Sequence, residues 1–441
     1  MPTSYLPYEP DQDLLLPHSL REWLPEDHLA HYISDTIETL DLGAFYERYE
    51  SGGARNQPFH PAMMVKVLVY GYATGVFSSR KIARKLHEDV AFRLLAAGNF
   101  PKHRTISDFR ALHLKELAEL FVQVVKLAGE CGLVRLGTIA VDGTKLKANA
   151  SKHKAMSYQR MQAAEVQLQA QIQGLLARAA QADRTEASEP ELDLPAEIAR
   201  REQRLAVIRA AQVRLQQRQR EADAARGRKP DDDDTGAGGG PRKPGPAFQR
   251  PFGEPLPKAQ DNFTDPDSRI MKSNAGFEQC YNAQTAVDAH AQIIVVAELT
   301  QSATDSGQLP GMIAALERNT GAAGALVLAD AGYRNEAAFA RLAESAPATE
   351  LIVALGREGK RRIGIEAANL PYTAGMAVKL ESPAGRSRYR RRKAIVEPAN
   401  AWIKQVLGFR QFSLRGVEKV RCEFKLVCAA LNLRRMARMG I

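Results

Sequence analysis

The sequence predicts a mixed α/β protein with an all-helical N-terminal part and a helical insertion. Three observations support this fold class. Apolar residues recur at helical spacing over the first 130 positions, short apolar strands follow from position 136, and a block rich in Ala, Gln, Arg and Glu interrupts those strands. At 441 residues the chain exceeds the size of one ordinary core, so two or three domains are expected.

The overall composition excludes several classes of protein. The first residues carry acids where a signal peptide needs a basic start, and no run of about 18 apolar residues predicts a membrane span. The four cysteines form no CxxC pair, which argues against a zinc or disulfide framework. The net charge of +10 favours a polyanionic partner. We therefore expect a cytoplasmic protein without a membrane partner.

Residues 1–130 are predicted to form several short helices. The apolar pattern of 60–96 is broken at Gly75, before a helix cap at Ser78 or Ser79. A long helix is expected to begin at Thr105 as N-cap, with Asp108 at its third position. Lys and Arg on the outer faces fit a DNA-binding helix-turn-helix arrangement and equally an ordinary bundle with a basic surface.

Residues 152–226 are predicted to form an inserted helical hairpin. Its second helix carries a seam with spacings of 7, 3 and 7, made by Ile198, Leu205, Ile208 and Leu215. Residues 227–259 are rich in Gly and Pro and are expected to be a disordered linker. The run DDDD at 231–234 lies in this linker and is interpreted as solvated charge rather than a metal cluster.

The remaining elements predict a mixed sheet. Strands are expected at 137–142, 281–288, 292–300, 324–330 and 349–355, with helices at 305–319 and 335–345 between the later ones. The strands at 281–288 and 292–300 are joined by a short polar turn and should form a hairpin. This order gives a sheet whose first three strands are antiparallel and whose last ones follow helical crossovers.

Two of these strands end on an aspartate followed by a small residue. Asp142 follows TIAV and Asp330 follows LVLA. Because sites in such sheets lie at strand ends, the two carboxylates should point into a common space, where a divalent cation would offset their repulsion. Two rival acids near strand ends have simpler interpretations, Asp305 as a helix cap and Asp288 as a hairpin-turn residue.

A third acid, Glu397, stands inside the most basic part of the chain. Residues 386–441 contain 15 Lys and Arg against 3 Asp and Glu, so this tail exceeds the charge excess of the whole chain. Pro398 is tolerated if it falls in the first turn of a helix. An acid among so many cations suits an enzyme that holds a metal ion with the acid and a phosphate backbone with its neighbours.

Several motifs together resemble the DDE transposases of bacterial insertion sequences: IAVDGTKLKANAS, TDPDSRIMK, GFEQCYNAQTAVD, ADAGYRN and RRRKAIVEPANAWIKQVLGFRQFSLRG. The resemblance implies an RNase H-like catalytic domain over 136–151 plus 260–433 and a DNA-binding domain over 1–130. It also implies that Asp142, Asp330 and Glu397 form a catalytic triad. They would hold two Mg²⁺ ions, for which Mn²⁺ would substitute.

The family also carries a Tyr-Arg-Glu-Lys signature around its third acid. Lys404 matches it, with six residues between it and Glu397, whereas Tyr389 and Arg392 stand one residue too far upstream and Lys393 replaces the expected arginine. The DNA-contacting residues implied by this signature and by the basic loading are Lys404, Arg392, Tyr389, Lys393, Lys145, Arg410 and Arg415. A second departure from the family is the insertion, which follows the first strand rather than the second aspartate.

The function implied is metal-dependent cleavage of DNA at the ends of an insertion sequence, followed by strand transfer into target DNA. The partners would be the terminal inverted repeats, the target DNA and a second copy of the chain in a dimer or larger assembly, associated with the bacterial nucleoid. Three alternatives stay open: a related nuclease without strand transfer, a non-catalytic DNA-binding protein derived from a transposase, and a scaffold acting through the helical hairpin.

Overall fold

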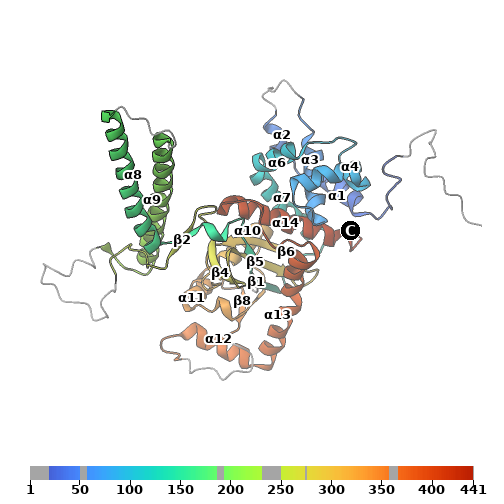
Figure 1. Ribbon diagram of the computed structural model, residues 1–441. Helices are drawn as coiled ribbons and strands as arrows, with labels where there is room; N and C mark the ends of the chain where they lie inside the picture. The colour runs from blue at the N-terminus through green and yellow to red at the C-terminus, as the bar shows by residue number, and fades with distance from the viewer. Residues whose placement is uncertain are drawn as a thin grey trace, which may run out of the picture.

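The computed structural model describes residues 19–49, 57–185, 193–230, 250–273, 276–356 and 366–440. A central sheet is flanked by helices, a group of helices from the N-terminal part lies along one side, and a two-helix hairpin projects from the other (Figure 1). The N-terminal helices are α1 (Leu29–Thr39), α2 (Gly43–Glu47), α3 (Pro61–Ala73), α4 (Ser79–Glu88), α5 (Val90–Leu95), α6 (His103–Leu112) and α7 (Leu114–Glu130).

The N-terminal helices confirm the predicted break at Gly75 and correct the prediction for the helix that follows. Gly75 has a positive φ of 81° after the end of α3. The prediction of a long helix capped by Thr105 is wrong: α6 begins at His103, and His113 separates it from α7. The fully buried His113 ring packs 4.5 Å from the Phe109 ring, so tertiary packing divides the apolar pattern into two helices.

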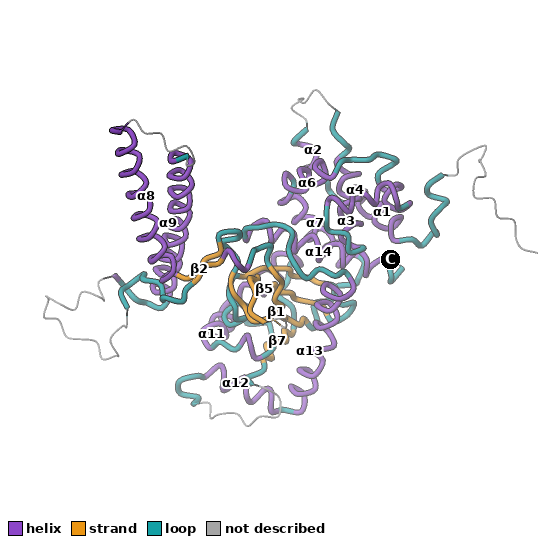
Figure 2. Tube along the Cα trace, viewed as in Figure 1, coloured by secondary structure: helices purple, strands orange, loops and turns teal. Residues whose placement is uncertain are grey.

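The sheet confirms the predicted mixed α/β architecture (Figure 2). Its strands are β1 (Ile139–Lys147), β4 (Arg269–Ser273), β5 (Gly276–Asp288), β6 (Ile294–Thr300), β7 (Leu326–Ala329) and β8 (Glu350–Val353). Strand β5 pairs antiparallel with β1 on one side and with β4 and β6 on the other, while β7 pairs parallel with both β1 and β8. The helical crossovers α10 (Leu309–Thr320) and α11 (Glu336–Ser345) join the later strands.

The expectation that the first strand ends at Asp142 is wrong. Strand β1 continues to Lys147, because β5 pairs with it without interruption from Ile139 opposite Asp288 to Lys147 opposite Cys280. It is β7 that stops, at Ala329 opposite Val141. Asp142 therefore lies within a paired strand, at the level where its parallel neighbour ends.

The C-terminal helices are α12 (Pro371–Glu381), α13 (Pro383–Ala401) and α14 (Val417–Ala437), with a π-helical turn at Trp402–Val406. Pro398 lies inside α13 and not in its first turn, where a proline costs least. A proline in a helix leaves the carbonyl four residues earlier without its usual donor. Here Gln292, in the turn between β5 and β6, donates its side-chain amide to the Ala394 carbonyl at 2.8 Å, which explains why the proline is tolerated.

Helix α14 joins the N-terminal helices to the sheet in one continuous apolar core, packing against α7, α3 and β6. A buried polar cluster crosses this junction. Glu423 of α14 is 1% exposed and accepts hydrogen bonds from the backbone N–H of Ser413 (3.0 Å) and of Leu414 (3.1 Å). Tyr72 of α3 donates to Glu423, and the buried Arg110 of α6 donates to the Tyr72 hydroxyl at 2.9 Å. Burial raises the pKa of Glu423.

The predicted hairpin is present as α8 (Tyr158–Thr185) and α9 (Leu194–Ala225), packed side by side. Leu205, Ile208 and Leu215 of the predicted seam are buried and Ile198 is half-buried. A short antiparallel pair that the sequence did not predict, β2 (Ala155–Ser157) and β3 (Gln260–Asn262), closes the base of the hairpin. Within the described ranges no helix is both long and apolar enough to cross a membrane.

Salt bridges also fix the base of the hairpin. Asp261 of β3 pairs with Arg214 (2.6 Å) and Arg218 of α9. Asp223, near the end of α9, pairs with Arg250 at 2.7 Å, so one end of the predicted linker is anchored. Residues 231–249 of that linker, including the DDDD run, lie outside the described residues.

Replacing Glu423 with alanine should destabilise the protein strongly. The change leaves two partly buried N–H groups without acceptors and removes the counter-charge of the buried Arg110, so we expect a loss of about 3 kcal/mol in the free energy of unfolding, measured with urea. The matched control is Glu418→Ala on the exposed face of the same helix, which should cost less than about 1 kcal/mol. Equal losses for the two variants would contradict the role assigned to the buried cluster.

Candidate active site

Two of the predicted acids lie side by side at the point where β7 ends. Val141 of β1 is level with Ala329 of β7, and the next residue on each strand is Asp142 and Asp330 respectively. Asp330 leaves its strand into a short 3₁₀ turn, Ala331–Tyr333, and its carboxylate accepts a hydrogen bond of 2.9 Å from the Gly332 N–H. Parallel pairing therefore sets the two acids level with each other, and the charge of Asp330 acts on Asp142.

The Asp142 carboxylate is held in a largely desolvated position beneath α13. Its side chain is 21% exposed and accepts a hydrogen bond from the Asn400 amide at 3.0 Å. Burial raises the pKa of Asp142 to about 6, the nearby Arg392 guanidinium opposes this shift, and the negative charge of Asp330 adds to it. Thr285 of β5 donates to the Asn400 carbonyl at 3.2 Å and so orients the amide. Such a carboxylate gains from any cation that approaches it.

The third predicted acid, Glu397, is on the same helix but is not joined to the other two. Its side chain is exposed, and among the described residues it makes no hydrogen bond or ion pair. Asn400, one helical turn further along α13, makes the contact with Asp142. Residues three apart on a helix are neighbours on its surface. Within the described part of the chain, no three His, Cys, Asp or Glu side chains are grouped closely enough to hold a metal ion.

The predicted DNA-contacting residues fall into two sets. Arg392 is 7% exposed, with Nη1 3.6 Å from the Asp142 carboxylate, and its Nε and Nη1 have no hydrogen-bond partner in the described ranges. Lys404 lies half-buried in the π-helical turn, where burial lowers its pKa and the Asp142 charge opposes that effect. Lys145 is also half-buried and lies 3.6 Å from the Asp305 carboxylate. These three cations surround the acid pair.

The second set lies further out. Lys393, Arg410 and Arg415 are exposed, and Tyr389 is half-buried. Arg410 donates through Nε to the Lys404 carbonyl at 3.1 Å, and Arg415 to the Asn149 carbonyl at 2.8 Å. Both guanidinium groups are thus anchored by the backbone while staying accessible to solvent. This arrangement suits contacts with an extended anion.

The rival acids have different outcomes. Asp288 is the last residue of β5, just before the hairpin turn, and it accepts hydrogen bonds from the backbone N–H groups of Leu136 (2.8 Å) and His290 (2.8 Å). Asp305 is not a helix cap, because α10 begins only at Leu309. Its carboxylate instead accepts from the side-chain amides of Asn282 and Gln284 on β5.

Sequence reasoning missed the polar residues that support the acids: Asn282, Gln284, Thr285, Tyr333 and Asn400. One signal was available in the strand at 281–288, where Asn and Gln alternate within an otherwise buried, apolar run. Buried amides require partners, so such an alternation indicates a polar network on one face of the sheet. Asn400 carried no comparable signal.

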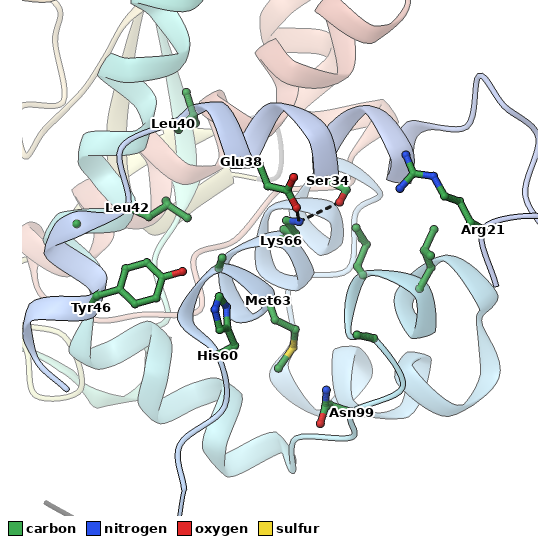
Figure 3. Close-up of a pocket in the computed structure, with 15 residues that line it drawn as sticks. Arg21, Ser34, Glu38, Leu40, Leu42, Tyr46, His60, Met63, Lys66 and Asn99 are labelled. Carbon is green, nitrogen blue, oxygen red and sulfur yellow. Dashed lines mark hydrogen bonds and ion pairs between the residues drawn. The ribbon is translucent and has the colours of Figure 1, made fainter. Parts of the chain in front are cut away.

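A separate pocket of about 760 Å³ lies among the N-terminal helices (Figure 3). Lys66 points into it and binds the Ser34 hydroxyl at 3.0 Å and the Glu38 carboxylate at 2.5 Å. The cation is therefore already satisfied, and the pocket is lined by none of the predicted site residues. We assign the candidate chemistry to the acid pair and not to this pocket.

Two family models match the chain. One, described as a transposase domain (DUF772), covers residues 18–112, and the other, described as a transposase DDE domain, covers residues 355–437. The two matches together support an insertion-sequence DDE transposase. The first match spans α1 to α6, and the second runs from the end of β8 through α14 and includes Glu397. No curated protein and no solved structure matches the chain.

The raised pKa of Asp142 predicts how the stability of the metal-free protein changes with pH. The pKa of this carboxyl is near 6 in the folded protein, against an ordinary value of 3.8. The free energy of unfolding therefore falls as the pH rises from about 4 through 6, because the folded state must give up a proton that it holds more tightly than the unfolded state does. Asp142→Asn removes this cost. We expect the variant to be more stable than the wild type by about 1–3 kcal/mol at pH 8, with the difference shrinking towards pH 4.

Urea unfolding in the presence of EDTA, repeated between pH 4 and pH 8, measures this difference. Asp108→Asn, an exposed acid on α6, is the control and should leave the pH profile unchanged. A wild-type protein that is as stable as Asp142→Asn at pH 8 would show that the carboxylate is not desolvated.

Proposed function

We propose that this transposase cleaves DNA at the ends of its insertion sequence and joins the freed ends to target DNA, with divalent metal ions. The observation that carries the proposal is the pair formed by Asp142 and Asp330, level on adjacent parallel strands and covered by the helix that bears Glu397. Two carboxylates fixed next to each other bind a hard cation well, and phosphoryl transfer on DNA needs such a cation.

The strand arrangement supports an RNase H-like catalytic domain over 136–151 plus 260–433. Strand β5 pairs antiparallel with β1, β4 and β6, and β7 and β8 add to the other side of β1 in parallel. The insertion at 152–226 leaves this sheet undisturbed, because it departs after β1 and returns before β4. The resemblance and the topology thus agree with each other.

The residues present fit a divalent metal in part. Asp142 and Asp330 offer carboxylate oxygens, which Mg²⁺ and Mn²⁺ prefer, and a bound cation would offset the desolvation that raises the pKa of Asp142. Glu397 would become the third metal-binding carboxylate if its side chain changed rotamer or α13 rotated, since it lies one turn from Asn400. Two ions bound there would activate the attacking oxygen and stabilise the leaving one.

The chain's own groups have separate roles around this pair. Asn400 orients the Asp142 carboxylate, and the buried Arg392 guanidinium, 3.6 Å from that carboxylate, adds a positive charge beside it. Tyr389 and the exposed Lys393, Arg410 and Arg415 would follow the DNA backbone, with Lys404 and Lys145 closer to the acids. Such contacts are sensitive to salt and do not read sequence.

The N-terminal helices would bind the terminal inverted repeats. Helix α4 is strongly amphipathic: Ile82 and Leu86 are buried, while Arg80, Lys81 and Arg84 are exposed on the other face. A cationic helix face of this kind suits the phosphate backbone of duplex DNA. A dimer or larger assembly on paired ends, in the cytoplasm and on the nucleoid, completes the proposal.

One observation favours a second candidate. Because Glu397 is exposed and has no contact with Asp142, the chain also fits a non-catalytic DNA-binding protein derived from a transposase. Such a protein would bind the inverted repeats and cleave nothing.

Variants of the acids separate these possibilities. Asp142→Ala, Asp330→Ala and Glu397→Gln should each lower Mn²⁺-dependent cleavage and joining by about 10³-fold, equivalent to roughly 4 kcal/mol of transition-state stabilisation. Binding to duplexes that carry the inverted repeat should stay near the wild-type level. The measurement uses labelled duplexes from the element ends, with cleaved and joined products resolved on a gel.

Glu418→Gln, an exposed acid on α14, is the matched control and should keep full activity. An additional oligonucleotide with a free 3′-OH tests strand transfer by itself. Cleavage without joining would identify a nuclease, binding without cleavage by the wild type would identify the non-catalytic protein, and unimpaired cleavage by Glu397→Gln would remove that residue from the site.

A further inference from the structure

The acid pair is backed by a polar network on the opposite face of the sheet from α13. Side chains of a strand alternate between its two faces, and paired residues on neighbouring strands point to the same face. Asp142 is paired with Thr285, which contacts Asn400 of α13. Gly143 is paired with Gln284, so Gln284 points the other way.

On that face Asp305 and Gln284 form a continuous link to the turn that carries Asp330. Asp305 Oδ1 accepts hydrogen bonds from the Gln284 amide at 2.7 Å and the Asn282 amide at 2.6 Å. The Gln284 carbonyl in turn accepts from the hydroxyl of Tyr333. Tyr333 is fully buried and is the last residue of the turn that begins directly after Asp330. The link therefore runs from Asp305 to the backbone of the acid's own turn.

Two glycines let this network approach both acids closely. A Cβ at Gly143 would lie 2.5 Å from the Gln284 amide nitrogen and would also collide with the Asp305 carboxylate. A Cβ at Gly332 would lie 3.0 Å from the Asp330 carboxylate and 3.1 Å from that of Asp305. The Asp305 carboxylate is thus packed against β1 next to Asp142 and against the turn next to Asp330.

We propose that Asp305 is a positioning residue for the acid pair, which through Gln284 and Tyr333 fixes the Asp330 turn relative to Asp142. The inference rests on the proposed function, because the placement matters only if the pair binds a metal ion. A positioning role follows from the contacts of Asp305: its Oδ1 already accepts two amide hydrogen bonds and faces the Lys145 ammonium at 3.6 Å. Partners that orient ligating carboxylates typically contribute about 10- to 100-fold to metal affinity.

The test is Mn²⁺ affinity of the full-length protein, measured by calorimetry without DNA. Asp305→Ala removes the acceptor and should weaken Mn²⁺ binding by about tenfold or more. Asp305→Asn keeps an oxygen that accepts both amides and should keep most of the wild-type affinity. Tyr333→Phe removes only the hydroxyl, and it should shift the affinity in the same direction as Asp305→Ala.

Glu336→Ala is the matched control. Glu336 also accepts hydrogen bonds from neighbouring groups, those of Tyr372 and Thr373, but it touches no member of the network. Its loss should leave the Mn²⁺ affinity unchanged, which separates positioning from general damage. If Asp305→Ala does not fold, Tyr333→Phe and Asp305→Asn decide the question.

Three results would overturn the inference. Wild-type affinity in a folded Asp305→Ala or in Tyr333→Phe would show that the link does not position the pair. An Asp305→Asn variant as weak as Asp305→Ala would show that Asp305 acts through its charge, as a ligand itself. A wild-type protein without Mn²⁺ affinity would contradict the proposed function, and this inference with it. Mn²⁺ affinity that is lost on replacing Asp142 but not on replacing Asp305 would contradict this inference alone.

Discussion

The site depends above all on the parallel pairing of β1 with β7. That register sets Val141 level with Ala329, so the residue that follows on each strand is an acid, and the two carboxylates must share one space. Burial and mutual repulsion make this arrangement costly, as the pKa of Asp142 near 6 indicates. Asn400 and Arg392 of α13 offset part of the cost on one face of the sheet. A bound cation would offset the rest.

The remainder of the fold keeps this register in place while allowing large additions to the chain. The insertion of α8 and α9 is closed at its base by the β2–β3 pair and by the salt bridges of the buried Asp261. The hairpin is therefore held by its own contacts and needs none from the central sheet. Helix α14 ties the N-terminal helices to β6 through a shared core and the Glu423 cluster. Any DNA bound by the N-terminal helices would therefore be held at a fixed place relative to the acids.

The sequence predicted the acid pair but not its surroundings, for physical reasons that differ from residue to residue. An apolar run ending in aspartate marks Asp142 and Asp330, because charge is expensive inside a sheet. Whether β1 stops there depends on its partner β5, which no local pattern reveals. The rotation of α13 decides whether Asn400 or Glu397 faces Asp142, and Pro398 is accepted inside the helix only because the distant Gln292 donates to Ala394. Asp305 is interpreted as a cap from the sequence because a helix is expected to begin at 305, whereas α10 begins at Leu309.

The central claim is that Asp142, Asp330 and Glu397 act together on a metal ion. A crystal structure of the transposase with Mn²⁺ and a duplex of its element end, recorded with anomalous scattering from manganese, tests this most directly. We expect an anomalous peak between the carboxylates of Asp142 and Asp330, with Glu397 turned towards it. A manganese peak elsewhere, or a loaded site from which Glu397 still faces solvent, would contradict this claim.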